Sequence, residues 1–221
     1  IFRDAGHILG SASLEVIVSG EGKPRRLVFS GDLGMSDRPV LCDPSPSPTE
    51  ADVLLIESTY GDRLHRSLPE TEDEIVAAFE RTCAAKGNLI IPAFAVGRTQ
   101  EIIYMLADLV RRKRLSPLKV YVDSPMANSA TRITLANQNL LDPETRELIA
   151  WLKAHPKQMS LELVADVERS IQLNDIRSGA VIISASGTIA MIGSSSHCPV
   201  ITATVASVAP SASDPVSPMN N

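Results

Sequence analysis

The chain has 221 residues, of which 44% are hydrophobic, so it can form one large or two small domains with a buried core. Its formal net charge of −5 excludes a basic surface over the whole molecule, and nucleic-acid binding would depend on a local patch. Widely spaced cysteines exclude a disulfide framework and a cysteine zinc site. The absence of a long apolar run or a signal-peptide pattern leads us to expect a cytoplasmic protein without a membrane span.

Two predicted strands near the start of the chain each adjoin a residue that could bind a metal ion. His7 lies in a Gly-flanked loop before residues 11–19, where side chains alternate as in a half-buried strand. Asp32 follows a second strand over residues 26–29. An imidazole and a carboxylate are ligands that a catalytic zinc ion accepts, and a carboxylate can bridge two ions. When each residue is considered alone, the alternative interpretations are that His7 is an ordinary loop histidine and that Asp32 is a turn residue.

A third strand is predicted over residues 53–56, whose continuous apolar run is typical of a fully buried strand. Glu57 comes directly after it. An imidazole and two carboxylates would then lie at the ends of three strands, which favours a metal site over three unrelated loop residues. His65 follows in a polar loop, and it is interpreted either as an exposed loop residue or as a neighbour of a substrate phosphate.

The remainder of the chain alternates helices and strands, after a proline-rich crossing loop between residues 35 and 50. The first helix begins near Pro69, ends before Gly87, and is predicted to bury Cys83 as a small core residue. Strand, loop, helix and strand in succession predict a mainly parallel sheet covered by helices. The expected elements are strands over 89–91, 119–122 and 180–184 and helices over 98–114 and 142–154.

Two charged features of this region have competing interpretations. The start of the helix at residues 97–100 offers backbone N–H groups and the Arg98 guanidinium, which could hold a phosphate, although capping alone would explain Thr99. The basic run 111–114 lies at the other end of the helix. We favour the interpretation that these cations interact with the helix dipole over the interpretation that they bind nucleic acid. Asp123, at the end of a strand, could bind a ligand or cap a helix.

Six ordered motifs resemble those of the β-CASP branch of the metallo-β-lactamase superfamily, which includes ribonuclease J and the endonuclease subunit of the eukaryotic cleavage-and-polyadenylation factor. The motifs are DAGHILGSASLEV, FSGDLG, LLIESTYGDRLH, IPAFAVGRTQEIIYML, VYVDSPMA and IISASG. The resemblance implies an α/β fold, with part of a metallo-β-lactamase αββα fold and a Rossmann-like β-CASP domain. It places the first segment at residues 1–62 and a truncated β-CASP domain at 63–187. Residues 188–221, rich in Ser, Ala, Pro, Thr and Val, are expected to form an aberrant or disordered tail.

The resemblance also implies a mechanism in which two zinc ions activate a water that attacks an RNA phosphodiester bond. In this scheme His7 ligates one ion, Asp32 bridges both, and Glu57 orients a metal-bound histidine or the leaving-group acid. RNA is the expected partner, no membrane is involved, and a homo-oligomer is left open. The residues expected to contact the substrate are Ser58, Thr59, His65, Arg98 and Ser186.

The His-x-His-x-Asp-His ligand cluster that precedes the His7 position in that family does not occur in these 221 residues. We therefore expect a fragment that alone binds metal weakly or not at all and does not cleave RNA. A frameshift shortly after Gly187 is our hypothesis for the change in composition, and translating the locus in all three frames would test it. The alternatives are a non-catalytic scaffold paralogue and a small-molecule hydrolase, and the long insertion after Glu57 argues against the latter.

Overall fold

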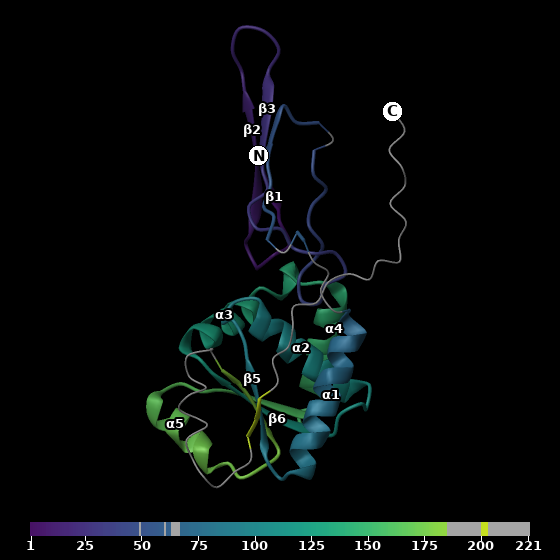
Figure 1. The fold of residues 1–221 in the computed structure, drawn as a ribbon, viewed down its shortest axis with the longest axis vertical. Helices are drawn as coiled ribbons and strands as arrows, with labels where there is room; N and C mark the ends of the chain where they lie inside the picture. The colour runs from purple at the N-terminus through teal and green to yellow at the C-terminus, as the bar shows by residue number, and fades with distance from the viewer. Residues whose placement is uncertain (49, 60, 63–66, 185–199, 203–221) are drawn as a thin grey trace.

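The computed structural model describes residues 1–48, 50–59, 61–62, 67–184 and 200–202, the last three by their backbone only. It has two lobes, a narrow one made by the N-terminal strands and a larger one that contains the helices (Figure 1). Most of the tail predicted for residues 188–221 lies outside the described residues, but residues 200–202 form a short strand in the sheet of the larger lobe, which differs from the disorder expected there. No described helix combines the length and the apolar character that crossing a bilayer requires.

The narrow lobe is a four-stranded sheet in the order β1-β2-β3-β4. The first three strands are antiparallel neighbours, and the fourth pairs in parallel with the third. A parallel pair cannot be joined by a tight hairpin, so the proline-rich loop crosses between these two strands. The strands are β1 (Phe2–Asp4), β2 (Ala12–Val18), β3 (Arg25–Phe29) and β4 (Val53–Leu55).

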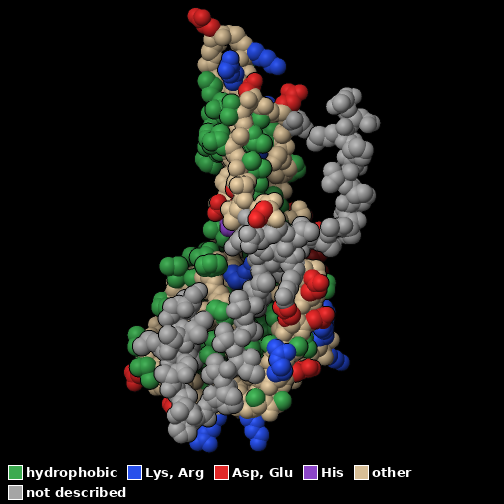
Figure 2. Space-filling model, viewed as in Figure 1, with side chains coloured by type: hydrophobic (Ala, Val, Ile, Leu, Met, Phe, Trp, Pro, Cys, Tyr) green, Lys and Arg blue, Asp and Glu red, His purple; other side chains and the backbone are tan. Residues whose placement is uncertain are grey.

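The prediction that β4 is fully buried is wrong. Val53, Leu54 and Leu55 are 46%, 56% and 50% exposed, and Ile56 is 62% exposed. The described helices all lie in the other lobe, so no helical layer covers this sheet (Figure 1). Hydrophobic side chains accordingly gather on the surface of the narrow lobe (Figure 2). The αββα sandwich of the expected first domain is therefore represented among the described residues by a sheet alone.

The expected alternation in β2 is also wrong at one position, because Glu15 is the buried residue of this strand, at 4% exposure. Its carboxylate forms ion pairs with Arg3 at 2.8 Å and with Arg26 at 3.0 Å, from the two neighbouring strands. A buried carboxylate is tolerated when cations pair with it. Charge pairing across three strands thus overrides the apolar pattern.

The larger lobe contains a five-stranded sheet in the order β7-β6-β8-β5-β9, in which all pairs are parallel. This confirms the expected α/β fold with a parallel sheet. Alternate side chains of a strand point to opposite faces, so Leu89 and Ile91 join one buried cluster while Ile90 joins another. The strands are β5 (Asn88–Pro92), β6 (Leu118–Asp123), β7 (Met159–Leu163), β8 (Ala180–Ser184) and β9 (Val200–Thr202).

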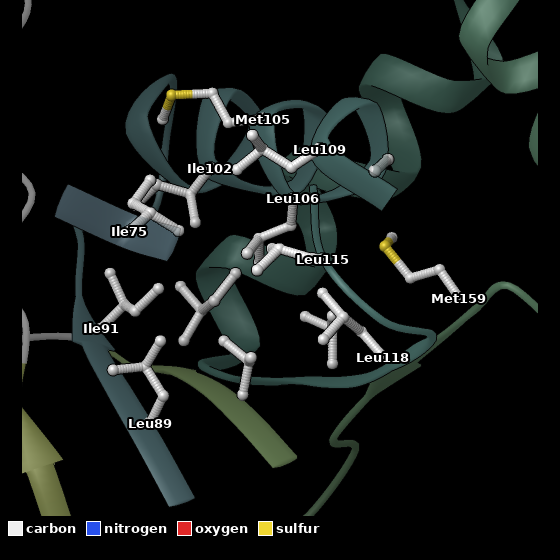
Figure 3. Packing of buried hydrophobic residues seen from close by; sticks show 14 of the residues in the cluster. Ile75, Leu89, Ile91, Ile102, Met105, Leu106, Leu109, Leu115, Leu118 and Met159 are labelled. Atoms are coloured by element: carbon white, nitrogen blue, oxygen red, sulfur yellow. The ribbon is translucent and has the colours of Figure 1, made fainter. Parts of the chain in front are cut away.

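Helices pack on both faces of this sheet. The larger hydrophobic cluster lies between the sheet and the first four helices, and Figure 3 shows its side chains meeting Leu89 and Ile91 of β5. Leu173 packs on the opposite face. The elements are α1 (Leu68–Ala84), α2 (Arg98–Arg111), α3 (Pro125–Ala136), η1 (Gln138–Leu140), α4 (Pro143–Ala154), α5 (Val167–Gln172) and η2 (Leu173–Asp175).

The starts of these helices agree with their sequence signals. Ser67 and Glu70 form a reciprocal capping box at α1, and prolines stand at the first turns of α1, α3 and α4.

The prediction that Cys83 is a core residue is wrong. Cys83 is exposed, and its neighbour Thr82 is buried instead, at 1% exposure. Because Thr82 donates its hydroxyl to the Ala78 carbonyl within the helix, its polar group does not prevent burial.

Candidate functional site

His7 and Asp32 lie next to each other at the end of the narrow lobe that meets the larger lobe. The His7 Nε2 atom is 4.0 Å from the Asp32 Oδ2 atom, and the two side chains are 45% and 78% exposed. Two ligand atoms of one tetrahedral zinc ion lie about 3.4 Å apart when each is about 2.1 Å from the metal. A small rotation of these exposed side chains would therefore allow both to bind one ion.

The two loops that carry these residues are held together by backbone contacts. Gly34 N–H donates to the Ala5 carbonyl at 2.7 Å, and a Cβ atom at position 34 would lie only 1.9 Å from the Gly6 oxygen. The Ser11 hydroxyl accepts from the His7 backbone N–H at 3.1 Å, which shapes the loop. The absence of a side chain at position 34 is what lets the Asp32 loop approach the His7 loop.

Glu57 is held beside the same loops. Its carboxylate accepts a hydrogen bond from the Leu33 backbone N–H at 2.6 Å. This bond lowers the pKa of Glu57 below its usual value, with help from Thr59 and from the charge of His7, although partial burial acts in the opposite direction. Glu57 is thus a fixed, ionised acceptor next to His7 and Asp32.

The described donor set is smaller than a complete zinc site. Among residues 1–48, 50–59, 61–62 and 67–184, no cluster of three or more His, Cys, Asp or Glu side chains could hold a metal ion. Catalytic zinc ions usually have three protein ligands. His7 and Asp32 fit a metal ion by chemistry and spacing, but they supply only part of the ligands that it needs.

Some expected substrate contacts lie close to this group. Ser58 and Thr59 come shortly after β4, are exposed, and follow Glu57 in the chain. His65 and Ser186 lie outside the described residues, so the structure gives no position for them.

Arg98 is at the start of α2, as expected, but the N–H groups around it are not free. The N–H of Gly97 donates to the Gln100 side chain, and those of Arg98 and Thr99 donate to carbonyls of the preceding loop. The Arg98 guanidinium pairs with Glu101 at 2.7 Å. The phosphate cradle of free N–H groups is therefore a wrong prediction, while substrate contact by the Arg98 side chain stays a prediction.

A cavity of about 280 Å³ lies between the two lobes, and His7 forms part of its wall. The sequence patterns did not indicate it, because its walls come from segments far apart in the chain. The lining residues are His7, Leu9, Pro39, Val40, Leu41, Val96, Gly97, Gln100, Glu101, Met126, Ser129, Ala130, Ile133 and Thr134.

The lobes are joined around this cavity by specific contacts. Val40 N–H donates to the Thr145 hydroxyl at 3.1 Å, and Asp142 N–H donates to the Val40 carbonyl at 3.3 Å. Glu101 on α2 also pairs with Arg38 of the crossing loop, at 3.1 Å. These bonds fix the crossing loop to α2 and to the start of α4.

The other charged residues singled out from the sequence have partners within the protein. In the basic run 111–114, Arg111 and Arg112 pair with Asp108, and Arg112 and Arg114 pair with Glu72. This agrees with a structural role for the run rather than a phosphate site. Asp123 is 6% exposed and accepts from the Ser170 hydroxyl at 2.9 Å, so it links β6 to α5.

Comparison with known proteins gives a consistent result. The Beta-Casp domain model matches residues 99–198. Ribonuclease TTHA0252 of Thermus thermophilus is 39% identical over 189 residues, which cover 86% of this chain and 42% of that protein. An RNase J-like protein of Methanocaldococcus jannaschii is 32% identical, with coverage of 67% of this chain and 34% of the relative.

A eukaryotic relative is more distant. Cleavage and polyadenylation specificity factor subunit 3 of Dictyostelium discoideum is 27% identical over 144 residues, or 65% of this chain and 18% of that protein. The chain thus spans less than half the length of each of these three relatives. The two-lobed structure, the parallel sheet and the matched domain all lead to the same family.

Proposed function

Because this chain belongs to the β-CASP family, we propose that it supplies part of the active site of a zinc-dependent ribonuclease. The observation that carries the proposal is the 4.0 Å approach of His7 to Asp32 at the junction of the two lobes. We assign residues 1–62 to the metal-binding part and residues 63–187 to a β-CASP domain.

In this proposal, His7 and the Asp32 carboxylate would hold zinc, and Asp32 would serve as a shared ligand if two ions bind. Bound zinc would lower the pKa of a coordinated water, so that this water could act as a nucleophile near neutral pH. Glu57 accepts a hydrogen bond from the Leu33 N–H at 2.6 Å, which lowers its pKa, so its carboxylate can orient a neighbouring histidine or the leaving-group acid. The fixed carboxylate needs no rearrangement before the reaction.

The substrate in this proposal is single-stranded RNA that passes between the lobes. Ser58 and Thr59 are exposed beside Glu57 and offer hydroxyl and backbone groups to phosphate oxygens. Arg98 pairs with Glu101 at 2.7 Å, and release from this carboxylate would let its guanidinium contact the RNA backbone. His65 and Ser186 lie outside the described residues and stay predicted substrate contacts. The Thermus thermophilus relative is a ribonuclease, which supports this substrate class.

Zinc titration followed by NMR of the histidine ring signals tests the metal site. With two candidate ligands among the described residues, the 221-residue chain is expected to bind zinc weakly, with shifts at the His7 ring and no RNA cleavage. Asp32→Ala should abolish the His7 response, whereas His155→Ala should leave it unchanged. His155 is a suitable control because it stacks on Trp151 at the end of α4, with ring centroids 4.9 Å apart.

Two outcomes would contradict the proposal. Zinc shifts at His7 that persist in Asp32→Ala would show that these residues do not share an ion. No response of His7 at millimolar zinc would favour a non-catalytic scaffold. Stoichiometric zinc with RNA cleavage by the wild-type chain would instead overturn the inference that its ligand set is incomplete.

A further inference from the structure

We propose that the cavity between the lobes binds one nucleobase of the RNA strand, an inference that rests on the proposed function. His7 contributes to the cavity wall and also approaches Asp32. A base inside the cavity would therefore lie next to a phosphate at the candidate metal ligands. The cavity would fix the position of the strand relative to the bond that is cleaved.

The volume of the cavity fits a single ring system. Pockets for complete small-molecule ligands usually measure about 300–1,000 Å³. At about 280 Å³, this cavity lies just below that range. It is therefore large enough for a nucleobase and slightly smaller than the usual pocket for a complete ligand.

The walls favour a base over a phosphate. Leu9, Val96, Met126 and Ile133 provide apolar surface, and a methionine thioether makes favourable contacts with aromatic rings. Neither Lys nor Arg occurs among the described residues that line the cavity, and the acidic side chain there is that of Glu101. A phosphate would meet no Lys or Arg side chain among these lining residues, whereas the flat face of a base would pack on their apolar side chains.

The polar side chains of the walls already have partners. The Gln100 amide accepts from Gly97 N–H at 2.8 Å and donates to the Thr131 hydroxyl at 2.9 Å. The hydroxyls of Ser129 and Thr134 donate to carbonyls within α3. Few groups are left to distinguish one base from another, so the cavity accepts different bases with weak preference.

The cavity is formed before RNA binds, because its walls are held in place. Val40 has a backbone φ of 85°, which a β-branched residue rarely adopts, and its hydrogen bonds to Thr145 and Asp142 fix it there. Gly97 has φ of 78°, and a Cβ at this position would lie 3.1 Å from the Ile8 side chain. A preformed cavity loses little entropy when it binds a base.

Abasic nucleotides test the proposal. A short single-stranded RNA and a series with one abasic nucleotide at each position are titrated with the chain in EDTA, and binding is measured by fluorescence anisotropy. We expect one position at which loss of the base weakens binding roughly tenfold, which is within the range for base stacking. Ala130→Leu, which fills the cavity, should remove this difference. Ala154→Leu on the exposed end of α4 is the matched control and should keep it.

Three results would overturn the base site. These are equal affinities for every abasic RNA, a position effect that survives Ala130→Leu, and no measurable binding of any of the RNAs. Because the measurements are made in EDTA, they do not depend on zinc. Loss of the zinc response at His7 defeats the proposed function, and equal abasic affinities defeat the base site, so the two failures are distinguishable.

Discussion

Replacement of Gly34 by alanine should separate the loops that carry His7 and Asp32. The added Cβ would lie 1.9 Å from the Gly6 oxygen, where real contacts are at least 3.0 Å, so the backbones must move apart by about 1.1 Å. This movement breaks the 2.7 Å hydrogen bond from Gly34 N–H to Ala5. Overpacking costs about 1–3 kcal/mol and the lost bond about 1 kcal/mol, so the free energy of unfolding should fall by about 2–4 kcal/mol.

Native-state hydrogen exchange of the β2 amides measures this loss in the narrow lobe itself. Zinc titration of the His7 ring should show a weaker response in the same variant, because its distance from Asp32 increases. Gly20→Ala is the control, since a Cβ there meets no atom within 4 Å. If Gly34→Ala and Gly20→Ala give the same protection within about 0.5 kcal/mol, the close approach of the loops is refuted.

Two further predictions concern stability. A hydrogen bond from Arg3 lowers the pKa of Glu15 against the effect of burial, and the charge of Arg26 adds to it. The ionised Glu15 carboxylate thus stabilises the protein at pH values above its unfolded-state pKa. This stabilisation is lost as the pH falls through the lower pKa of the native state. Glu15→Gln should therefore lower the urea midpoint at pH 7 but not in strong acid. A pH-independent difference would contradict this reasoning. Leu106→Ala removes a side chain with 0% exposure from the core of the larger lobe, so the free energy of unfolding should fall by about 2–5 kcal/mol, measured by thermal unfolding. A decrease below about 1 kcal/mol would contradict the packing described.

The elements of the larger lobe that could be predicted are those for which local pattern and burial agree. The apolar run 89–91 is a strand buried on both faces, and the amphipathic spacing after Gly97 is a helix, although α2 ends at Arg111 rather than Arg114. The edge strand β7 (Met159–Leu163) was not predicted. Its polar Ser160 and Glu162 interrupt the apolar run, and Glu162 is paired with Arg169 of α5, a contact that no local pattern shows.

The narrow lobe was harder to predict because exposure there depends on which layers cover the sheet. The run Val53 to Ile56 has the composition of a buried strand, yet its side chains are exposed. The charge of Glu15 predicts a surface position, yet this residue is buried and pairs with arginines of two other strands. A sequence pattern reports what a side chain prefers and does not report which neighbours the fold provides.

For the candidate site, the sequence indicated the chemical groups but not their support. His7, Asp32 and Glu57 were selected because each stands at a strand end. The contact that brings the loops together involves Gly34, whose role is visible only when both loops are in place. The cavity likewise depends on walls from α2, α3 and the crossing loop, so only the folded chain reveals it.

The strained Val40 has a consequence for how the molecule can move. It is bonded to the start of α4, and the adjacent Leu41 forms a β-bridge with Leu141. The crossing loop is thus fixed to the larger lobe at this point, and a change in the angle between the lobes would require rotation of the chain outside this segment.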